Sequence, residues 1–238
     1  MSEQGTTPVT RAGLCIPDYE LLRPIGQGAY GEVWLARNVT GSFVALKVVQ
    51  RAAFDHDRPF EREFEGIKRF EPISRTDPSQ LAIFHVGRGD GFFYYVMELA
   101  DGAEGENEKG GKGAGEKTSD GASHPPLLPF SPLLPFSPAS YVPQTLKRLL
   151  NDRGALPGGE CIAIALSLTR ALAHLHGHKL VHRDVKPSNV IFVNGVAKLA
   201  DIGLVTSVDA TRSFVGTEGY LPPEGVKSKF ACKNGLRA

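Results

Sequence analysis

The sequence has few cysteines, almost no net charge and no long apolar run. Its three cysteines, Cys15, Cys161 and Cys232, are scattered and lack the spacing of metal ligands, which argues against a disulfide scaffold and for a reducing compartment. The formal net charge is +1, so no global field favours nucleic acid or an anionic membrane as a partner. No apolar run is long enough to span a bilayer, and the first residues lack the apolar core of a signal peptide. We therefore expect a soluble, cytoplasmic protein with no membrane segment and no nucleic-acid partner.

What is present is enough apolar sequence for a folded domain. Of the 238 residues, 41% are hydrophobic, which allows one domain or two small lobes. Residues 1–16 are polar and are expected to form a flexible tail. Five strand-like segments and one helical segment then follow, up to about residue 100.

A glycine-rich loop separates the first two strand-like segments. Gly26, Gly28 and Gly31 follow residues 19–25 and precede residues 32–36. In dinucleotide-binding folds the last glycine of such a motif opens a helix, whereas the Val-Trp-Leu content of 32–36 favours a strand. A glycine loop between two strands is typical of a flap over phosphates, because glycine lets the backbone approach them closely.

A lysine lies in the middle of the next apolar strand, residues 43–49. Alternation places Ala45 and Lys47 on one face of this strand. A buried lysine needs an anion nearby, whereas an exposed lysine at a sheet edge needs none. The strand by itself leaves both interpretations open.

The helical segment, residues 59–70, has one glutamate that is expected to face inward. Apolar residues at positions 60, 64, 67 and 70 mark its buried stripe, and three glutamates lie among them. Glu63 is selected because an apolar residue, Ile67, follows four positions later, as expected for an inward-facing position.

Two more strands, 81–86 and 92–100, precede a change of composition over residues 101–140. The first half of this insertion is rich in Gly, Glu and Lys and is expected to be disordered. The second half contains a tandem Pro/Leu/Phe repeat from Pro126 to Pro138, which favours an extended linker. A docking peptide is the less favoured alternative.

Two helices are predicted after the insertion, over residues 143–150 and 159–177. Apolar residues cover more than one face of the second helix, so it requires neighbours on several sides.

A dense polar segment follows this helix. It runs from Val181 to Asn189 and includes His182-Arg183-Asp184 and Lys186; the apolar residues 190–200 with a central Asn-Gly come next, and then Asp201. Asn-Gly between apolar runs predicts a hairpin, which would bring Asn189 and Asp201 together. Two oxygen ligands suit Mg²⁺. The alternative is a basic turn before an ordinary hairpin, with Asp201 capping a local group.

Together these motifs resemble the eukaryotic-type (Hanks-type) serine/threonine protein kinase family. The resemblance implies an α+β, two-lobe fold with a five-stranded antiparallel N-lobe carrying one helix and a mainly helical C-lobe. It divides the chain into a tail (1–16), an N-lobe (17–100), the insertion (101–140), a C-lobe part with catalytic loop and activation segment (141–224) and a short tail (225–238). Few residues follow the Pro-Pro-Glu that ends at Glu224, so the C-lobe is expected to be incomplete. The helix over residues 159–177 would then expose an apolar patch around Leu166 and Leu172, which would serve self-association or a partner.

The resemblance also implies roles in phosphotransfer from Mg-ATP to a protein substrate. Asp184 would accept the proton of the substrate hydroxyl, Lys186 would neutralise the γ-phosphate, and Asn189 and Asp201 would hold Mg²⁺. Lys47, steadied by Glu63, would hold the α- and β-phosphates. The implied ATP-binding residues are Ile25, Gly26, Gly28, Gly31, Val33, Ala45, Lys47, Glu63, Met97, Glu98, Ala100 and Ile191.

Within that set, the resemblance places Val33 and Ala45 above the adenine and Ile191 below it. Met97 would border the adenine, and the Glu98 carbonyl and Ala100 amide would reach its edge. Asp101 would either reach the ribose or simply start the linker.

Lys186, two positions after Asp184, and Gly216-Thr217, ahead of Tyr220, resemble serine/threonine rather than tyrosine kinases. Thr211 and Ser213 are the candidate phosphorylation sites. Three functions stay open: a working kinase, an inactive nucleotide-binding fragment, and an adaptor that recruits partners.

Overall fold

The computed structural model describes residues 14–28, 30–103, 137–202, 206–207 and 220. Several predictions lie outside these residues. They concern most of the N-terminal tail, residues 104–136 of the insertion, Thr211, Ser213, Gly216-Thr217, Pro222-Pro223-Glu224 and the tail 225–238.

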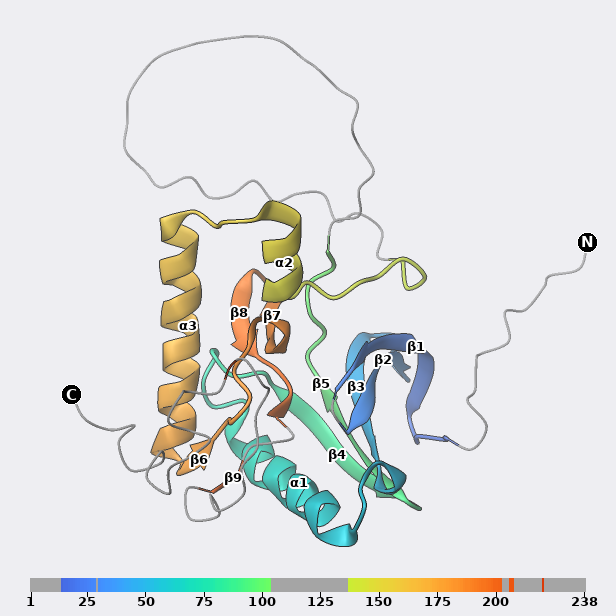
Figure 1. Cartoon of the computed structure of the whole chain (residues 1–238). Helices are drawn as coiled ribbons and strands as arrows, with labels where there is room; N and C mark the ends of the chain where they lie inside the picture. The colour runs from blue at the N-terminus through green and yellow to red at the C-terminus, as the bar shows by residue number, and fades with distance from the viewer. Residues whose placement is uncertain (1–13, 29, 104–136, 203–205, 208–219, 221–238) are drawn as a thin grey trace, which may run out of the picture.

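The N-terminal part of the chain is a five-stranded antiparallel sheet in the order β1-β2-β3-β5-β4 (Figure 1). Its strands are β1 (Tyr19–Gln27), β2 (Gly31–Asn38), β3 (Phe43–Gln50), β4 (Ile83–Gly89) and β5 (Phe92–Met97). This confirms the predicted five-stranded N-lobe, and each strand lies within a few residues of the predicted range.

Alternation along β3 separates two apolar clusters on opposite faces of the sheet. Ala45 and Val49 belong to the cluster that packs against helix α1 (Asp57–Phe70). Val44, Leu46 and Val48 belong to the outer cluster, which also contains Ile16. The face assignment of Ala45 and Lys47 is therefore confirmed.

Helix α1 buries the predicted stripe. Phe60, Ile67 and Phe70 are buried in the core under the sheet, and Phe64 is half-buried against it. Glu63 is buried on the same side of the helix, with 4% of its surface exposed. A carboxylate in this position is costly unless it is protonated or paired, which makes its surroundings informative.

The second part of the chain comprises two helices and short strands. These are α2 (Leu146–Arg153), α3 (Gly158–Gly177), β6 (Leu180–Val181), β7 (Val190–Val193), β8 (Val196–Leu199) and β9 (Thr206–Ser207). Short 3-10 turns occur at Arg51–Ala53, Glu71–Ile73 and Pro187–Asn189.

Helix α2 begins three residues later than predicted. Residues 143–145 are extended instead, and Thr145 forms a bridge with Ile191 of β7. Thr145 is the N-cap residue, and its hydroxyl accepts a hydrogen bond from the Arg148 amide at 3.1 Å. The threonine thus stops the extended segment and starts the helix.

The β7–β8 hairpin has the predicted Asn-Gly turn. Asn194 and Gly195 have φ angles of 51° and 73°, as a type I′ turn requires. Both amides donate to the carboxylate of Asp101, each at 2.8 Å. Asp101 therefore caps the hairpin, a role that neither of its two predicted alternatives included.

Helix α3 is only partly covered. Ala171 and Leu175 are buried, whereas Ile162 and Leu166 are 63% and 54% exposed. Leu172 is half-buried, because it packs against the cluster formed with Val190, Ala197 and other residues of the hairpin. The predicted patch is correct for Leu166 and wrong for Leu172. No helix in the described part of the chain has both the length and the apolar content to cross a membrane.

Candidate active site

A cavity lies between the N-terminal sheet and the β7–β8 hairpin. Its lining contains residues from the glycine loop, from β3 and β5, from the segment after β5 and from the chain on either side of the hairpin. They are Ile25, Gly26, Gln27, Gly28, Val33, Ala45, Lys47, Tyr95, Met97, Glu98, Ala100, Tyr141, Pro143, Thr145, Ser188, Asn189, Ile191, Ala200 and Asp201. Most of the sequence-predicted ligand contacts therefore meet at one place.

The glycine loop closes one side of this cavity. The Gly28 amide donates to the Gly31 carbonyl at 2.9 Å, which narrows the loop between β1 and β2. A Cβ atom on Gly28 would lie 3.3 Å from the Lys47 ammonium, whereas one on Gly31 would lie 2.1 Å from the Val48 carbonyl oxygen. Gly31 does not line the cavity. A side chain at this position would collide with β3, so glycine is needed here for β2 to lie close to β3.

Lys47 is buried and its partner is Asp201. The Lys47 ammonium lies 2.5 Å from the Asp201 carboxylate, and only 2% of the lysine surface is exposed. Burial by itself would lower the pKa of Lys47, but the fields of Tyr95, Asp201 and Glu63 raise it, so the lysine stays charged. The buried-lysine interpretation of the sequence is therefore confirmed.

Glu63 does not form the predicted pair with Lys47. Within the described residues, neither of its carboxylate oxygens has a hydrogen-bond partner. Burial raises the pKa of Glu63 to about 7, although the positive charge of Lys47 lowers it. The prediction that Glu63 steadies Lys47 is wrong for this conformation, because Asp201 holds the ammonium group.

The segment before the hairpin forms a compact polar cluster around Asp184. The Asn189 amide nitrogen donates to the Asp184 carbonyl at 2.9 Å and to its carboxylate at 2.8 Å. The Lys186 ammonium lies 2.8 Å from the same carboxylate. The three residues implied in catalysis are thus brought together by a single loop.

His182 connects this loop to the residue that follows β8. Its Nε2 hydrogen-bonds the Ala200 carbonyl at 3.0 Å, and the Asp184 amide donates to its Nδ1 at 3.4 Å. These contacts require the neutral imidazole that carries its proton on Nε2, and burial lowers the pKa of His182 accordingly. The histidine therefore links Asp184 to the strand end that leads into Asp201.

Asn189 and Asp201 meet at the base of the hairpin, as predicted. The Ala200 amide donates to the Asn189 carbonyl at 2.7 Å. Asp201 has a φ of 57°, an uncommon backbone conformation for a residue other than glycine. Both residues line the cavity, and Asp201 Oδ2 lies 3.5 Å from a Cβ position on Gly28, so the Asp201 carboxylate is next to the glycine loop.

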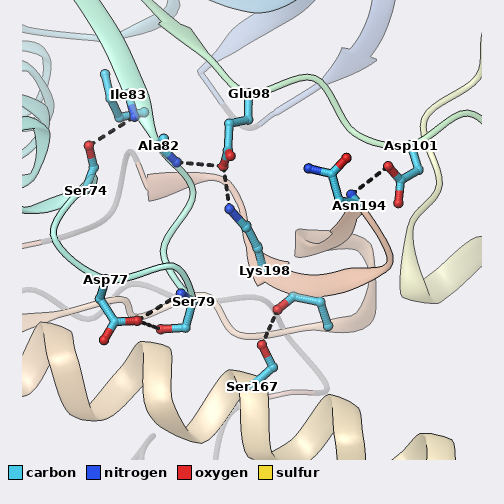
Figure 2. A network of polar contacts seen from close by, with 11 residues as sticks. Ser74, Asp77, Ser79, Ala82, Ile83, Glu98, Asp101, Ser167, Asn194 and Lys198 are labelled. Atoms are coloured by element: carbon cyan, nitrogen blue, oxygen red, sulfur yellow. Dashed lines mark hydrogen bonds and ion pairs between the residues drawn. The ribbon is translucent and has the colours of Figure 1, made fainter. Parts of the chain in front are cut away.

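A second buried ion pair ties the segment after β5 to the hairpin (Figure 2). The Glu98 carboxylate accepts from the Lys198 ammonium at 2.7 Å and from the Ala82 amide at 2.9 Å. Lys198 was not among the predicted residues, although a lysine inside an apolar strand is the signal that selected Lys47.

Tyr141 was also missed. It lines the cavity together with Pro143 and Thr145, all from the segment that follows the insertion. No local pattern in this segment indicates a site residue, because the contact depends on the path by which the chain returns to the hairpin.

Comparison with known proteins agrees with the geometry of this site. The family model described as "Protein kinase domain" matches residues 139–234. A probable serine/threonine-protein kinase of Clostridium perfringens is 27% identical over 89% of this chain, and the serine/threonine-protein kinase PrkC of Bacillus subtilis is 27% identical over 90%. These matches support a Hanks-type serine/threonine protein kinase.

The kinase domain match and the kinase relatives confirm the resemblance and the α+β, two-lobe fold inferred from the motifs. Aurora kinase A-A of Xenopus laevis is a further kinase relative, 27% identical over 91% of this chain. The chain spans 26%, 28% and 44% of the lengths of the three curated relatives named here.

Proposed function

We propose that the chain is a serine/threonine protein kinase that transfers the γ-phosphate of ATP to hydroxyl groups of a protein substrate. The observation that carries the proposal is the shared cavity, where the glycine loop and Lys47 face Asn189 and Asp201. These residues come from both ends of the described chain, and the site needs all of them for one ligand.

The apolar part of the cavity suits a purine ring. Val33 and Ala45 from the sheet lie on one side and Ile191 from the hairpin lies on the other, with Met97 at the end of β5. Glu98 and Ala100 also line the cavity, where the Glu98 carbonyl and the Ala100 amide would meet the edge of the base. A flat base between aliphatic side chains with backbone contacts at its rim is a typical arrangement for a nucleotide site.

The polar part of the cavity suits a phosphate chain. Lys47 supplies a buried positive charge, and the position of Gly28 next to it leaves room for phosphate oxygens. Asp201 now holds the Lys47 ammonium, so a bound triphosphate would replace one anion by another. This exchange allows Lys47 to hold the α- and β-phosphates without the cost of an unpaired charge.

The donors at the base of the hairpin fit Mg²⁺. Asn189 and Asp201 offer one amide oxygen and one carboxylate, and Mg²⁺ commonly takes one or two carboxylates together with substrate phosphates. The remaining positions of the octahedral shell would be filled by phosphate oxygens and water. Bound there, Mg²⁺ would neutralise charge on the transferred phosphate.

Asp184 is the group that would accept the proton of the substrate hydroxyl. Hydrogen bonds from Asn189 fix its carboxylate, and Lys186 lies beside it to neutralise the γ-phosphate. The activation-segment residues that would be phosphorylated, Thr211 and Ser213, stay part of the proposal.

The test is autophosphorylation of the purified chain with labelled Mg-ATP, beside Asp184→Asn. A general base typically contributes about 10²–10⁴-fold, so incorporation should fall by that order. Asp152→Asn is the matched control, because Asp152 lies on the exposed surface of α2 and should leave incorporation unchanged. Equal incorporation by the wild type and Asp184→Asn would contradict the assignment.

Two alternative functions are separated by the same experiment. If the chain is an inactive nucleotide-binding fragment, no label is incorporated but Mg-ATP still raises the melting temperature. If it is an adaptor, neither effect is seen, and the exposed Ile162 and Leu166 of α3 become the expected partner site or self-association site.

The free, exposed Cys15 and Cys161 support a reducing, cytoplasmic location.

A further inference from the structure

The chain that returns from the insertion forms one wall of the nucleotide cavity. Two short runs, residues 101–103 and 142–144, are joined by backbone hydrogen bonds. The Ala103 amide donates to the Val142 carbonyl at 2.8 Å, and the Gln144 amide donates to the Asp101 carbonyl at 2.8 Å. The Phe192 amide donates to the Gln144 carbonyl at 3.1 Å, which continues the ladder to β7. This wall is therefore fixed to the hairpin as well as to the segment after β5.

Tyr141 lies at the start of this wall and is directed at the segment after β5. Its hydroxyl donates to the Ala100 carbonyl at 2.9 Å. The tyrosine is 5% exposed and Ala100 is 8% exposed, so the hydrogen bond is shielded from solvent. Both residues line the cavity.

The backbone near Tyr141 is held from the opposite side as well. The Arg23 guanidinium of β1 donates to the Pro138 carbonyl at 2.7 Å. The Tyr141 amide donates a hydrogen bond to the Ser137 carbonyl at 3.0 Å, which closes a turn over residues 137–141. Anchored from β1 and from β7, the tyrosine is in a position that packing and backbone contacts define.

We infer that Tyr141 determines which purine the cavity accepts, by occupying the hydrogen-bond acceptor that a 2-amino group on the base would need. The inference rests on the proposed nucleotide-binding function. It assigns a specificity role to a residue that the insertion delivers and that lies outside the motifs described above.

The chemical argument concerns neighbouring atoms of the purine ring. If the Ala100 amide meets N1 of adenine, the adjacent C2 atom lies next to Ala100 as well, and the Ala100 carbonyl is the nearest backbone acceptor to it. Adenine carries only hydrogen at C2, whereas 2-aminoadenine and guanine carry an amino group there. Because Tyr141 already donates to this carbonyl, a 2-amino group must share the oxygen with the phenol at its second lone pair, or displace the phenol, and so gains less from this partner than it would from an unoccupied carbonyl.

The experiment compares the dissociation constants of Mg-ATP and Mg-2-amino-ATP for the wild type and Tyr141→Phe. The two nucleotides share the hydrogen-bonding groups at N1 and N6 and differ only at C2. The wild type should bind Mg-2-amino-ATP no more tightly than Mg-ATP. Tyr141→Phe keeps the ring but releases the carbonyl, so the affinity ratio should move towards 2-amino-ATP by about 2- to 10-fold, the value of one ordinary hydrogen bond.

Tyr94→Phe is the matched control. Tyr94 is a buried tyrosine of β5 in the outer cluster of the sheet, so removal of its hydroxyl should leave the ratio unchanged. Any general loss of stability acts on both nucleotides and cancels in the ratio.

Three outcomes decide the matter. A shift of the ratio in Tyr141→Phe but not in Tyr94→Phe supports the specificity role. Tight binding of both nucleotides with the same ratio in all three proteins overturns it while leaving the proposed nucleotide site intact. Failure of the wild type to bind either nucleotide overturns the proposed function itself, and with it this inference.

Discussion

The Lys47 ammonium is bonded to the Asp201 carboxylate, 154 residues further along the chain. The cation proposed to hold phosphates and the carboxylate proposed to hold Mg²⁺ thus neutralise each other across the cavity. Arrival of Mg-ATP would separate them and give each a new partner of opposite charge. Glu63 remains close enough to influence both residues electrostatically without a bond to either.

Replacement of Lys47 by methionine should weaken Mg-ATP binding by about 10- to 100-fold, the equivalent of one charge-assisted hydrogen bond. Methionine keeps most of the volume of the buried stem, so the loss reports the charge. Isothermal titration with Mg-ATP measures it. Lys68→Met on α1 is the control, because Lys68 is exposed and pairs only locally with Glu65. Unchanged affinity in Lys47→Met would remove this residue from the site.

Replacement of Glu63 by glutamine should abolish a pH dependence of stability. The pKa of Glu63 is raised by burial from 4.5 to about 7, so the folded state binds a proton that the unfolded state has lost between these values. The contribution of protonated Glu63 to the free energy of unfolding is complete below pH 4.5, and it is lost as the pH rises to about 7. Between pH 4.5 and 7 the free energy of unfolding of the wild type should fall by about 3 kcal/mol relative to that of Glu63→Gln.

Urea unfolding of the two proteins at several pH values measures this difference, since the other titrating groups are common to both. Glu65→Gln, on the exposed face of the same helix, should track the wild type at every pH. A wild-type-minus-Glu63→Gln difference that stays flat from pH 4.5 to 7 would mean that the carboxylate is paired or hydrated in solution.

Replacement of Glu98 by alanine should destabilise the fold by up to about 3–5 kcal/mol, because it leaves the Lys198 ammonium buried without its carboxylate. Side-chain exposures of 9% for Lys198 and 21% for Glu98 place this pair well inside the surface. Denaturant midpoints of Glu98→Ala, Lys198→Met and the double variant complete a mutant cycle. The double variant should cost less than the sum of the two single changes, and strict additivity would refute the coupling.

Replacement of both Ile162 and Leu166 by glutamine should reduce the binding of a hydrophobic dye and any self-association, since these side chains form the exposed apolar face of α3. Dye fluorescence and sedimentation velocity report the two effects. Val39→Gln provides the comparison, because Val39 is 78% exposed and lies in the turn between β2 and β3 rather than on α3. Equal dye binding by the wild type and the double variant would mean that the dye-binding apolar surface is not on α3.

Local chemistry explains which parts of this fold were predictable. The turn at Asn194 and Gly195 follows from the dihedral angles that these two residues tolerate, and it brings Asn189 and Asp201 together without help from the rest of the chain. The burial of Glu63 follows from helical spacing, because Ile67 lies one turn away on the same face.

Partner choice was less predictable, because it depends on distant segments. Nothing near Lys47 indicates whether Glu63 or Asp201 will hold its ammonium, since both carboxylates lie within its electrostatic reach. Asp101 and Tyr141 depend on the path of the chain after β5, and their partners, Gly195 and Ala100, are 94 and 41 residues away. The roles of the site residues in binding and catalysis stay predictions until the experiments above are done.

The hydrogen bond between Ala103 and Val142 has a practical consequence for protein engineering. It joins the two ends of the insertion at their base, so the number of residues between them does not determine the position of Tyr141 or Thr145. Loop-closure entropy rises by only about 0.6 kcal/mol for each doubling of length. A reporter peptide or a small domain grafted between residues 104 and 136 should therefore leave the cavity geometry intact, which makes this point of the chain a natural attachment site for a sensor.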